Sequence, residues 1–110
     1  GGAAKPIFFI GVDSNQNPFG DTDGDPATLN FGLTSMLKRV DVASYNSVMD
    51  VVNGTFTPGV VNLGLAEDGV DYALDEYNSA LIPEAVVAAV NQAKQDIIDG
   101  KIVVTDYRLQ

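Results

Sequence analysis

The hydrophobic positions of this chain form short runs and helical stripes, which predict alternating strands and helices. The first run covers 7–12, Ile-Phe-Phe-Ile-Gly-Val, and follows a proline. It is too short for a helix, and a nearly unbroken apolar run of this length is typical of a strand buried on both faces of a parallel sheet. A second, weaker strand is expected over 29–35.

The two predicted strands are separated by a polar segment over 14–28, rich in Asn, Asp, Gly and Pro. Such a composition predicts a loop. Its 15 residues exceed the usual length of a connection between two elements, which favours a functional or mobile segment.

A first helix is predicted over 38–52, because apolar residues recur there at helical spacing. Thr34 or Ser35 can cap its start, and Asn53-Gly54 suits its end. The stripe expected to face the core consists of Val42, Tyr45, Met49 and Val52.

A second helix is predicted between Pro83 and Asp99. Proline suits the first turn, Glu84 complements the positive end of the helix dipole, and Gly100 suits the position after the end. Its buried stripe is expected to be Val86, Val90, Ala93 and Ile97.

Three more strands are expected in the second half of the chain. The runs 60–65 and 70–74 flank an Ala-Glu-Asp-Gly segment, and an Asp-Gly turn between apolar runs predicts a hairpin. A short strand is expected over 102–104. This order of elements predicts an α/β fold with helices packed on a sheet. Because the first strand lacks a preceding covering helix, the chain is expected to be part of something longer.

The charge and the residue inventory exclude several functions. Six Lys and Arg against fifteen Asp and Glu give a net charge of −9, so nucleic acids and anionic membranes are poor partners. The chain has no Cys and no His. It therefore lacks thiol nucleophiles, serine–histidine relays, disulfides and most zinc and haem sites. We expect no catalytic residue, no metal site and no cofactor.

Asp13 is the most informative polar residue, because it directly follows the first apolar run. Ligands of open α/β sheets bind outside the carboxyl ends of the strands, which is where Asp13 is expected. An Asx turn that starts the loop is the structural alternative. Lys38 and Arg39 could reach the same edge and pair with Asp13, or could be solvated surface cations.

The acidic segment 21–26, Asp-Thr-Asp-Gly-Asp-Pro, begins like a calcium-binding loop. The pattern then fails, because Pro26 stands where glycine is needed and Gly32 stands where a bidentate glutamate is needed. A solvated acidic loop is the better interpretation.

Four ordered motifs resemble the C-terminal part of the basic-membrane-protein family, the purine-nucleoside-receptor-like substrate-binding lipoproteins of bacterial ABC transporters. They lie at 10–16 (Ile-Gly-Val-Asp-Ser-Asn-Gln), 33–41 (Leu-Thr-Ser-Met-Leu-Lys-Arg-Val-Asp), 62–70 and 82–102. The resemblance covers nearly the whole chain.

This resemblance implies a periplasmic-binding-protein-like fold (type I) of two α/β lobes with the ligand between them. Residues 1–110 would be a C-terminal segment, mostly of the second lobe, with segments returning toward the first. It also implies that Asp13 and Lys38 contact the ribose of a purine nucleoside. The partner would be an ABC permease, and the location extracytoplasmic, with a lipid anchor upstream.

Two departures from the family pattern stand out. The family usually carries Asp where this chain has Asn15, and the loop over 17–27 is longer than typical. The family's base-stacking aromatic residues lie upstream of this chain, so the purine preference rests on resemblance alone.

Two alternatives to a transport receptor stay open at this stage. One is a regulatory or surface-exposed relative without a transport role, and the other is a carboxylate-dependent nucleoside hydrolase. We further expect the isolated segment to self-associate, because it would expose strand edges and apolar faces.

Overall fold

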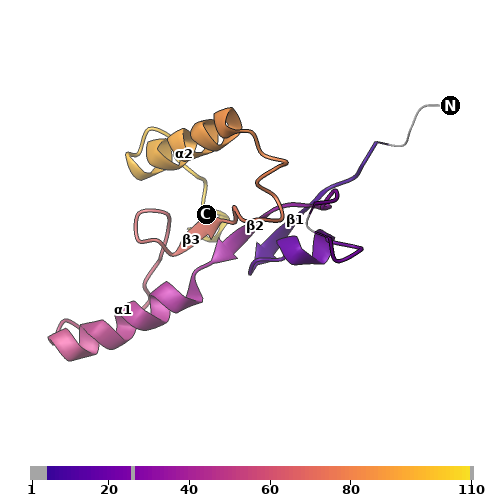
Figure 1. The fold of residues 1–110 in the computed structure, drawn as a ribbon. Helices are drawn as coiled ribbons and strands as arrows, with labels where there is room; N and C mark the ends of the chain where they lie inside the picture. The colour runs from indigo at the N-terminus through magenta and orange to yellow at the C-terminus, as the bar shows by residue number, and fades with distance from the viewer. Residues whose placement is uncertain (1–4, 26, 110) are drawn as a thin grey trace.

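The computed structural model describes residues 5–25 and 27–109, which form a three-stranded sheet with helices beside it (Figure 1). The strands are β1 (Phe9–Asp13), β2 (Gly32–Lys38) and β3 (Val70–Tyr72). The central strand β2 is parallel to β1 and antiparallel to β3. A parallel sheet is expected from the sequence, and the pair of β1 and β2 agrees with it, whereas β3 makes the sheet mixed.

Two α-helices and two short 3-10 helices complete the described chain. They are α1 (Val40–Asn53), α2 (Glu84–Ile98), η1 (Asn17–Gly20) and η2 (Tyr107–Leu109). Both predicted α-helix ends are confirmed, since Gly54 and Gly100 adopt the left-handed conformation with φ of 71° and 76°.

The start of α1 differs from the prediction. Thr34 and Ser35 do not cap the helix, because both lie inside β2, which runs to Lys38. Arg39 is the residue before the helix and forms no side-chain cap. The strand lies later than the predicted 29–35 because residues before it are held by the loop: the Phe31 amide donates to the Gly20 carbonyl at 3.0 Å.

The predicted hairpin over 60–74 is wrong. Residues 61–64 form no strand, and the chain folds into a turn in which the Gly69 amide donates to the Gly64 carbonyl at 2.9 Å. The strand β3 then pairs with β2 instead of with the preceding segment. The predicted strand over 102–104 is also wrong, because that segment pairs with no strand of the described chain.

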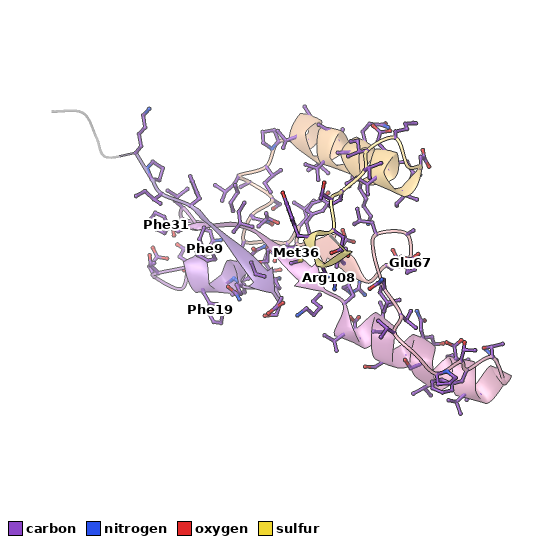
Figure 2. All side chains as sticks on the ribbon, turned by 180° about the vertical axis from the view of Figure 1, so that it is seen from behind. Phe9, Phe19, Phe31, Met36, Glu67 and Arg108 are labelled. Atoms are coloured by element: carbon purple, nitrogen blue, oxygen red, sulfur yellow. The ribbon has the colours of Figure 1, made fainter. Side chains whose placement is uncertain are left out.

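The α2 helix lies beside one face of the sheet, whereas α1 projects away from it (Figure 1). Two contacts connect α2 to β3: the Lys94 Nζ lies 3.1 Å from Asp71, and the Tyr72 hydroxyl donates to Asn91 at 2.8 Å. Most side chains of α1 are exposed, and the loop that follows the helix runs back along it (Figure 2).

The apolar positions expected to be buried are largely exposed. Ile10 and Val12 of β1 are 60% and 51% exposed, so β1 is not covered on both faces. Neither helix has a fully buried residue, which contradicts the buried stripes predicted for them. The α2 stripe of Val86, Val90, Ala93 and Ile97 does face the sheet, since these residues line hollows that they share with Tyr72 of β3, but it is only partly covered. On α1, Tyr45 and Val52 remain more than half exposed.

Within the described residues, no helix has the length and the apolar character needed to cross a bilayer.

Candidate functional site

Asp13 and Lys38 lie side by side at the carboxyl ends of two adjacent parallel strands. The Lys38 Nζ is 2.7 Å from the Asp13 Oδ1. The two side chains are 65% and 61% exposed, respectively, so both remain open to a solute. The sequence placed Asp13 at this edge and proposed Lys38 as its partner, and the structure brings the two together.

Asp13 has an unusual backbone conformation that directs its side chain. Strand pairing sets Asp13 beside Leu37, and side chains alternate between the faces of a sheet, so regular strands would place Lys38 on the other face. Asp13 instead has a φ of 75°, in the left-handed region. Aspartate tolerates this region better than most residues with a Cβ. The chain turns there, and the carboxylate meets Lys38.

The turn after Asp13 is held by contacts to β2 and to β1 itself. The Gln16 amide donates to the Ser35 Oγ at 2.9 Å, and the Gln16 Nε2 donates to the Val12 carbonyl at 2.9 Å. Gly11 permits this close packing, because a Cβ there would lie 2.6 Å from the Ser35 Oγ.

A polar network lies directly beneath this turn. The side chains of Asn17, Ser35 and Asn78 are completely buried. The Ser35 Oγ donates to the Asn17 Oδ1 at 2.9 Å, and the Asn17 Nδ2 donates to Asp75 at 3.1 Å. Buried polar groups are stable when they are paired in this way. The sequence analysis missed this network, for which the only signal is an Asn-rich segment between apolar runs.

Arg39, the second cation near this edge, is engaged elsewhere. Its guanidinium donates to both carboxylate oxygens of Asp41 at 3.0 and 2.9 Å. The hydrogen bonds from Arg39 lower the pKa of Asp41, and those same bonds raise the pKa of Arg39. The exposed Asp13–Lys38 pair is therefore the cation–carboxylate pair at the ends of the parallel strands.

The acidic loop is ordered by its own carboxylates. The Asp21 carboxylate accepts from the Gly24 amide at 2.8 Å, and Asp23 accepts from the Asp25 amide at 3.0 Å. The Asp25 amide, together with the Thr28 hydroxyl, holds the pKa of Asp23 below its usual value. In the part of the chain that the structure describes, no three acidic side chains are arranged to hold a metal ion.

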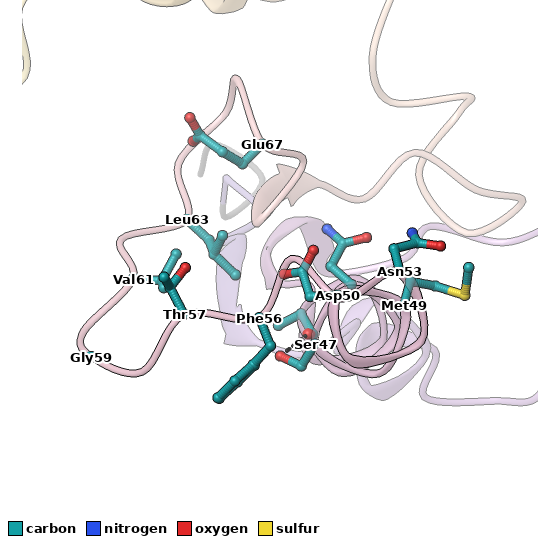
Figure 3. Close-up of a pocket in the computed structure, with 12 residues that line it drawn as sticks. Ser47, Met49, Asp50, Asn53, Phe56, Thr57, Gly59, Val61, Leu63 and Glu67 are labelled. Carbon is teal, nitrogen blue, oxygen red and sulfur yellow. Dashed lines mark hydrogen bonds between the residues drawn. The ribbon is translucent and has the colours of Figure 1, made fainter.

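A hollow of about 790 Å³ lies away from this edge. It is formed by α1 from Ala43 onward and by the segment that follows the helix (Figure 3). Polar side chains such as Asn46, Asn53 and Asp50 line it, and neither Asp13 nor Lys38 does. The loop that closes it is exposed throughout 54–62, so this hollow marks a helix that lacks a covering layer.

No family model matches the chain. Three relatives do. It is 36% identical over 103 residues to the ABC transporter nucleoside-binding protein BmpA of Lactococcus lactis, covering 92% of this chain and 28% of that protein. It is 34% identical over 105 residues to the CD4+ T-cell-stimulating antigen of Listeria monocytogenes, covering 94% and 29%. A stretch of 35 residues, 32% of this chain and 9% of the other, is 54% identical to an uncharacterised lipoprotein of Pyrococcus abyssi.

The fold agrees with these relatives. An ABC transporter solute-binding protein of Aeropyrum pernix superposes with a TM-score of 0.57 at 28% identity, covering 92% of this chain and 34% of that one. The α/β fold of a solute-binding protein is therefore confirmed.

The resemblance to the basic-membrane-protein family is confirmed as well: the chain is homologous to a segment of these ABC-transporter substrate-binding proteins. The chain spans less than a third of the length of the two relatives that it matches over most of its own length.

Proposed function

We propose that the protein is the extracytoplasmic solute-binding component of an ABC importer, and that it binds purine nucleosides between two lobes. The observation that carries this proposal is the pairing of Asp13 with Lys38 at the rim of the sheet, at 2.7 Å and with both side chains exposed. The printed name of the Lactococcus relative, a nucleoside-binding protein, supports the choice of ligand.

The chemistry of the pair suits a ribose. A carboxylate accepts hydrogen bonds through two oxygens, so Asp13 can accept from both hydroxyls of a vicinal diol. An ammonium group only donates, so Lys38 can donate to a sugar oxygen while it remains beside Asp13. Closure of the opposite lobe over the pair would remove water and strengthen these bonds.

The exposed apolar faces support the view that residues 1–110 are a C-terminal segment, mostly of the second lobe. Ile10 and Val12 on the sheet, and Tyr45 and Val52 on α1, are each more than half exposed. Monomeric proteins rarely leave so much apolar surface in water. In the proposed whole protein, the remaining part of both lobes covers these faces.

The relatives are solute-binding proteins, which favours binding without catalysis. The proposal accordingly assigns no catalytic residue and no cofactor. The permease of the same system is the proposed protein partner. The lipoprotein among the relatives supports a lipid anchor upstream and an extracytoplasmic location.

A regulatory or surface-exposed role without transport is the second candidate. It is favoured by one observation, that a relative of equal similarity carries the name of a T-cell-stimulating antigen. Uptake of labelled nucleoside by cells with and without the gene separates the two, since only the transport role predicts reduced uptake.

Isothermal titration of the full-length protein with adenosine, guanosine and inosine tests the ligand. Saturable heat with at least one nucleoside supports the proposal, and free ribose is the control for recognition of the sugar alone. Absence of heat with all three nucleosides would overturn the assignment of the ligand. Chromatography of the mixtures would show free base if the protein were a hydrolase.

A further inference from the structure

We infer that Asp75 is a positioning residue: it holds the turn after β1 and thereby sets the direction in which the Asp13 carboxylate faces. The inference rests on the proposed function in so far as Asp13 is a ligand residue. Asp75 lies 62 residues further along the chain and belongs to a segment that the sequence analysis did not single out.

Two amides of the turn converge on one oxygen of Asp75. The Asn15 Nδ2 donates to the Asp75 Oδ2 at 2.7 Å, and the Asn17 Nδ2 donates to the same oxygen at 3.1 Å. The other oxygen accepts from the Tyr77 amide at 2.9 Å. Both side-chain oxygens of Asp75 therefore accept hydrogen bonds. A carboxylate can do this, whereas an amide has only one acceptor oxygen.

A buried side chain fixes Asp75 itself. The Asn78 Oδ1 accepts from the Asp75 amide at 2.8 Å. The Asn78 Nδ2 donates to the carbonyl oxygens of Leu33 and Ala73, both at 2.9 Å. Asn78 is completely buried, so it anchors Asp75 to the central strand β2.

The converging amides belong to the turn that orients Asp13. Asn15 follows Asp13 by two residues, and the Asn17 side chain accepts from Ser35 at 2.9 Å. Ser35 in turn accepts from the Gln16 amide at 2.9 Å. A left-handed backbone at a residue other than glycine persists only where the surroundings hold it. The described contacts that hold Asp13 at a φ of 75° thus lead to Asp75.

Asp75→Asn is the sharpest test, because it keeps the shape and turns one acceptor into a donor that faces two donors. Asn15→Asp removes the donor instead, so that two carboxylates would face and repel each other. The double variant restores the hydrogen bond between positions 15 and 75 with reversed polarity, whereas the Asn17 amide still faces a donor. Glu76→Gln is the matched control: it removes one negative charge from the adjacent, exposed residue.

Two readouts are measured on the full-length protein. The first is the affinity for nucleoside by isothermal titration. Each single variant is expected to bind about tenfold more weakly, the double variant more tightly than either single variant but more weakly than the wild type, and the control unchanged. The second is local: the carboxyl carbon signal of Asp13 and the amide exchange of Gln16, both by NMR, are expected to change in the single variants and to recover in the double variant.

The local readout decides the inference independently of the ligand. If the wild type binds no nucleoside, the proposed function fails, and the Asp13 and Gln16 signals alone test Asp75. If those signals are unchanged in a folded Asp75→Asn variant, the inference is overturned. Should that variant not fold, Asn15→Ala at an exposed position replaces it, with the same two outcomes.

Discussion

The carboxylate of Asp13 and the ammonium of Lys38 lie 2.7 Å apart, although strand pairing sets Asp13 beside Leu37. The contact exists because Asp13 leaves the strand in a left-handed turn. An ion pair this exposed contributes little to stability, typically up to about 1 kcal/mol. Its position at the rim of the sheet is therefore better explained by binding than by folding.

Replacing Lys38 separates these two roles. Lys38→Met is expected to weaken nucleoside binding by about 1.5–3 kcal/mol, which is the range for a hydrogen bond to a charged group. The free energy of unfolding should change little, because the ion pair is exposed. Lys94→Met is the control, because its partnership with Asp71 is more buried, with side chains 26% and 28% exposed. It should lower stability and leave affinity unchanged. Titration and urea unfolding measure the two effects, and equal affinity of Lys38→Met and wild type would contradict the role of Lys38.

Close backbone packing at Gly20 predicts a strong effect on stability. A Cβ on Gly20 would overlap the backbone nitrogen of Gly32, and backbone atoms cannot move aside easily. Gly20→Ala is expected to destabilise the protein by about 2–3 kcal/mol. Gly24→Ala meets only open space, but its φ of 77° should cost about 1 kcal/mol. Urea unfolding that ranks Gly24→Ala as the more harmful change would contradict the packing.

The acidic loop should keep its structure in moderately acidic solution. Because the pKa of Asp23 is lowered in the folded chain, its contribution to stability is present above the ordinary pKa and is lost as pH falls through the lowered value. A carbon NMR titration should show this low midpoint. Thr28→Val removes the hydroxyl that donates to the Asp23 carboxylate, and it should raise the midpoint part of the way toward the ordinary value. An unchanged midpoint would contradict the contact between Thr28 and Asp23.

The isolated 110-residue chain is expected to self-associate and to bind nucleosides weakly or not at all. Its exposed sheet face around Ile10 and Val12 would favour contact between copies. Light scattering should give a mass above that of the monomer, and Ile10→Lys should reduce it. Val60→Lys, at a position 96% exposed and outside the sheet, is the control. A monomer at all concentrations would contradict this prediction.

The elements with strong local signals were predictable from the sequence. The run before Asp13 indicated a strand end, and glycines marked both helix ends, because these features depend on neighbouring residues. Pairing between strands was not predictable in the same way. From the sequence, β3 could have paired with the segment before Gly69. In the structure, β3 pairs with β2 instead.

The site was predictable in part for the same reason. The family motifs name Asp13 and Lys38, and parallel pairing of β1 with β2 brings both residues to one edge of the sheet. Asp75 carries no local signal, since its partners Asn15 and Asn17 lie 60 and 58 residues away. Apolar stripes predict which face a helix buries, but they do not show that the layer covering that face lies within the same segment.

The central claim is that an ionised carboxylate at position 13 receives the sugar of a nucleoside. Isothermal titration of the full-length protein, comparing wild type with Asp13→Asn and Asp13→Ala, tests it most directly. Asparagine keeps the shape and tolerates the left-handed backbone, so a loss of affinity in this variant reports the charge and the second acceptor oxygen of the carboxylate. We expect both variants to lose about 2 kcal/mol or more of binding free energy while remaining folded. Nucleoside binding of unchanged affinity in both variants would contradict the claim.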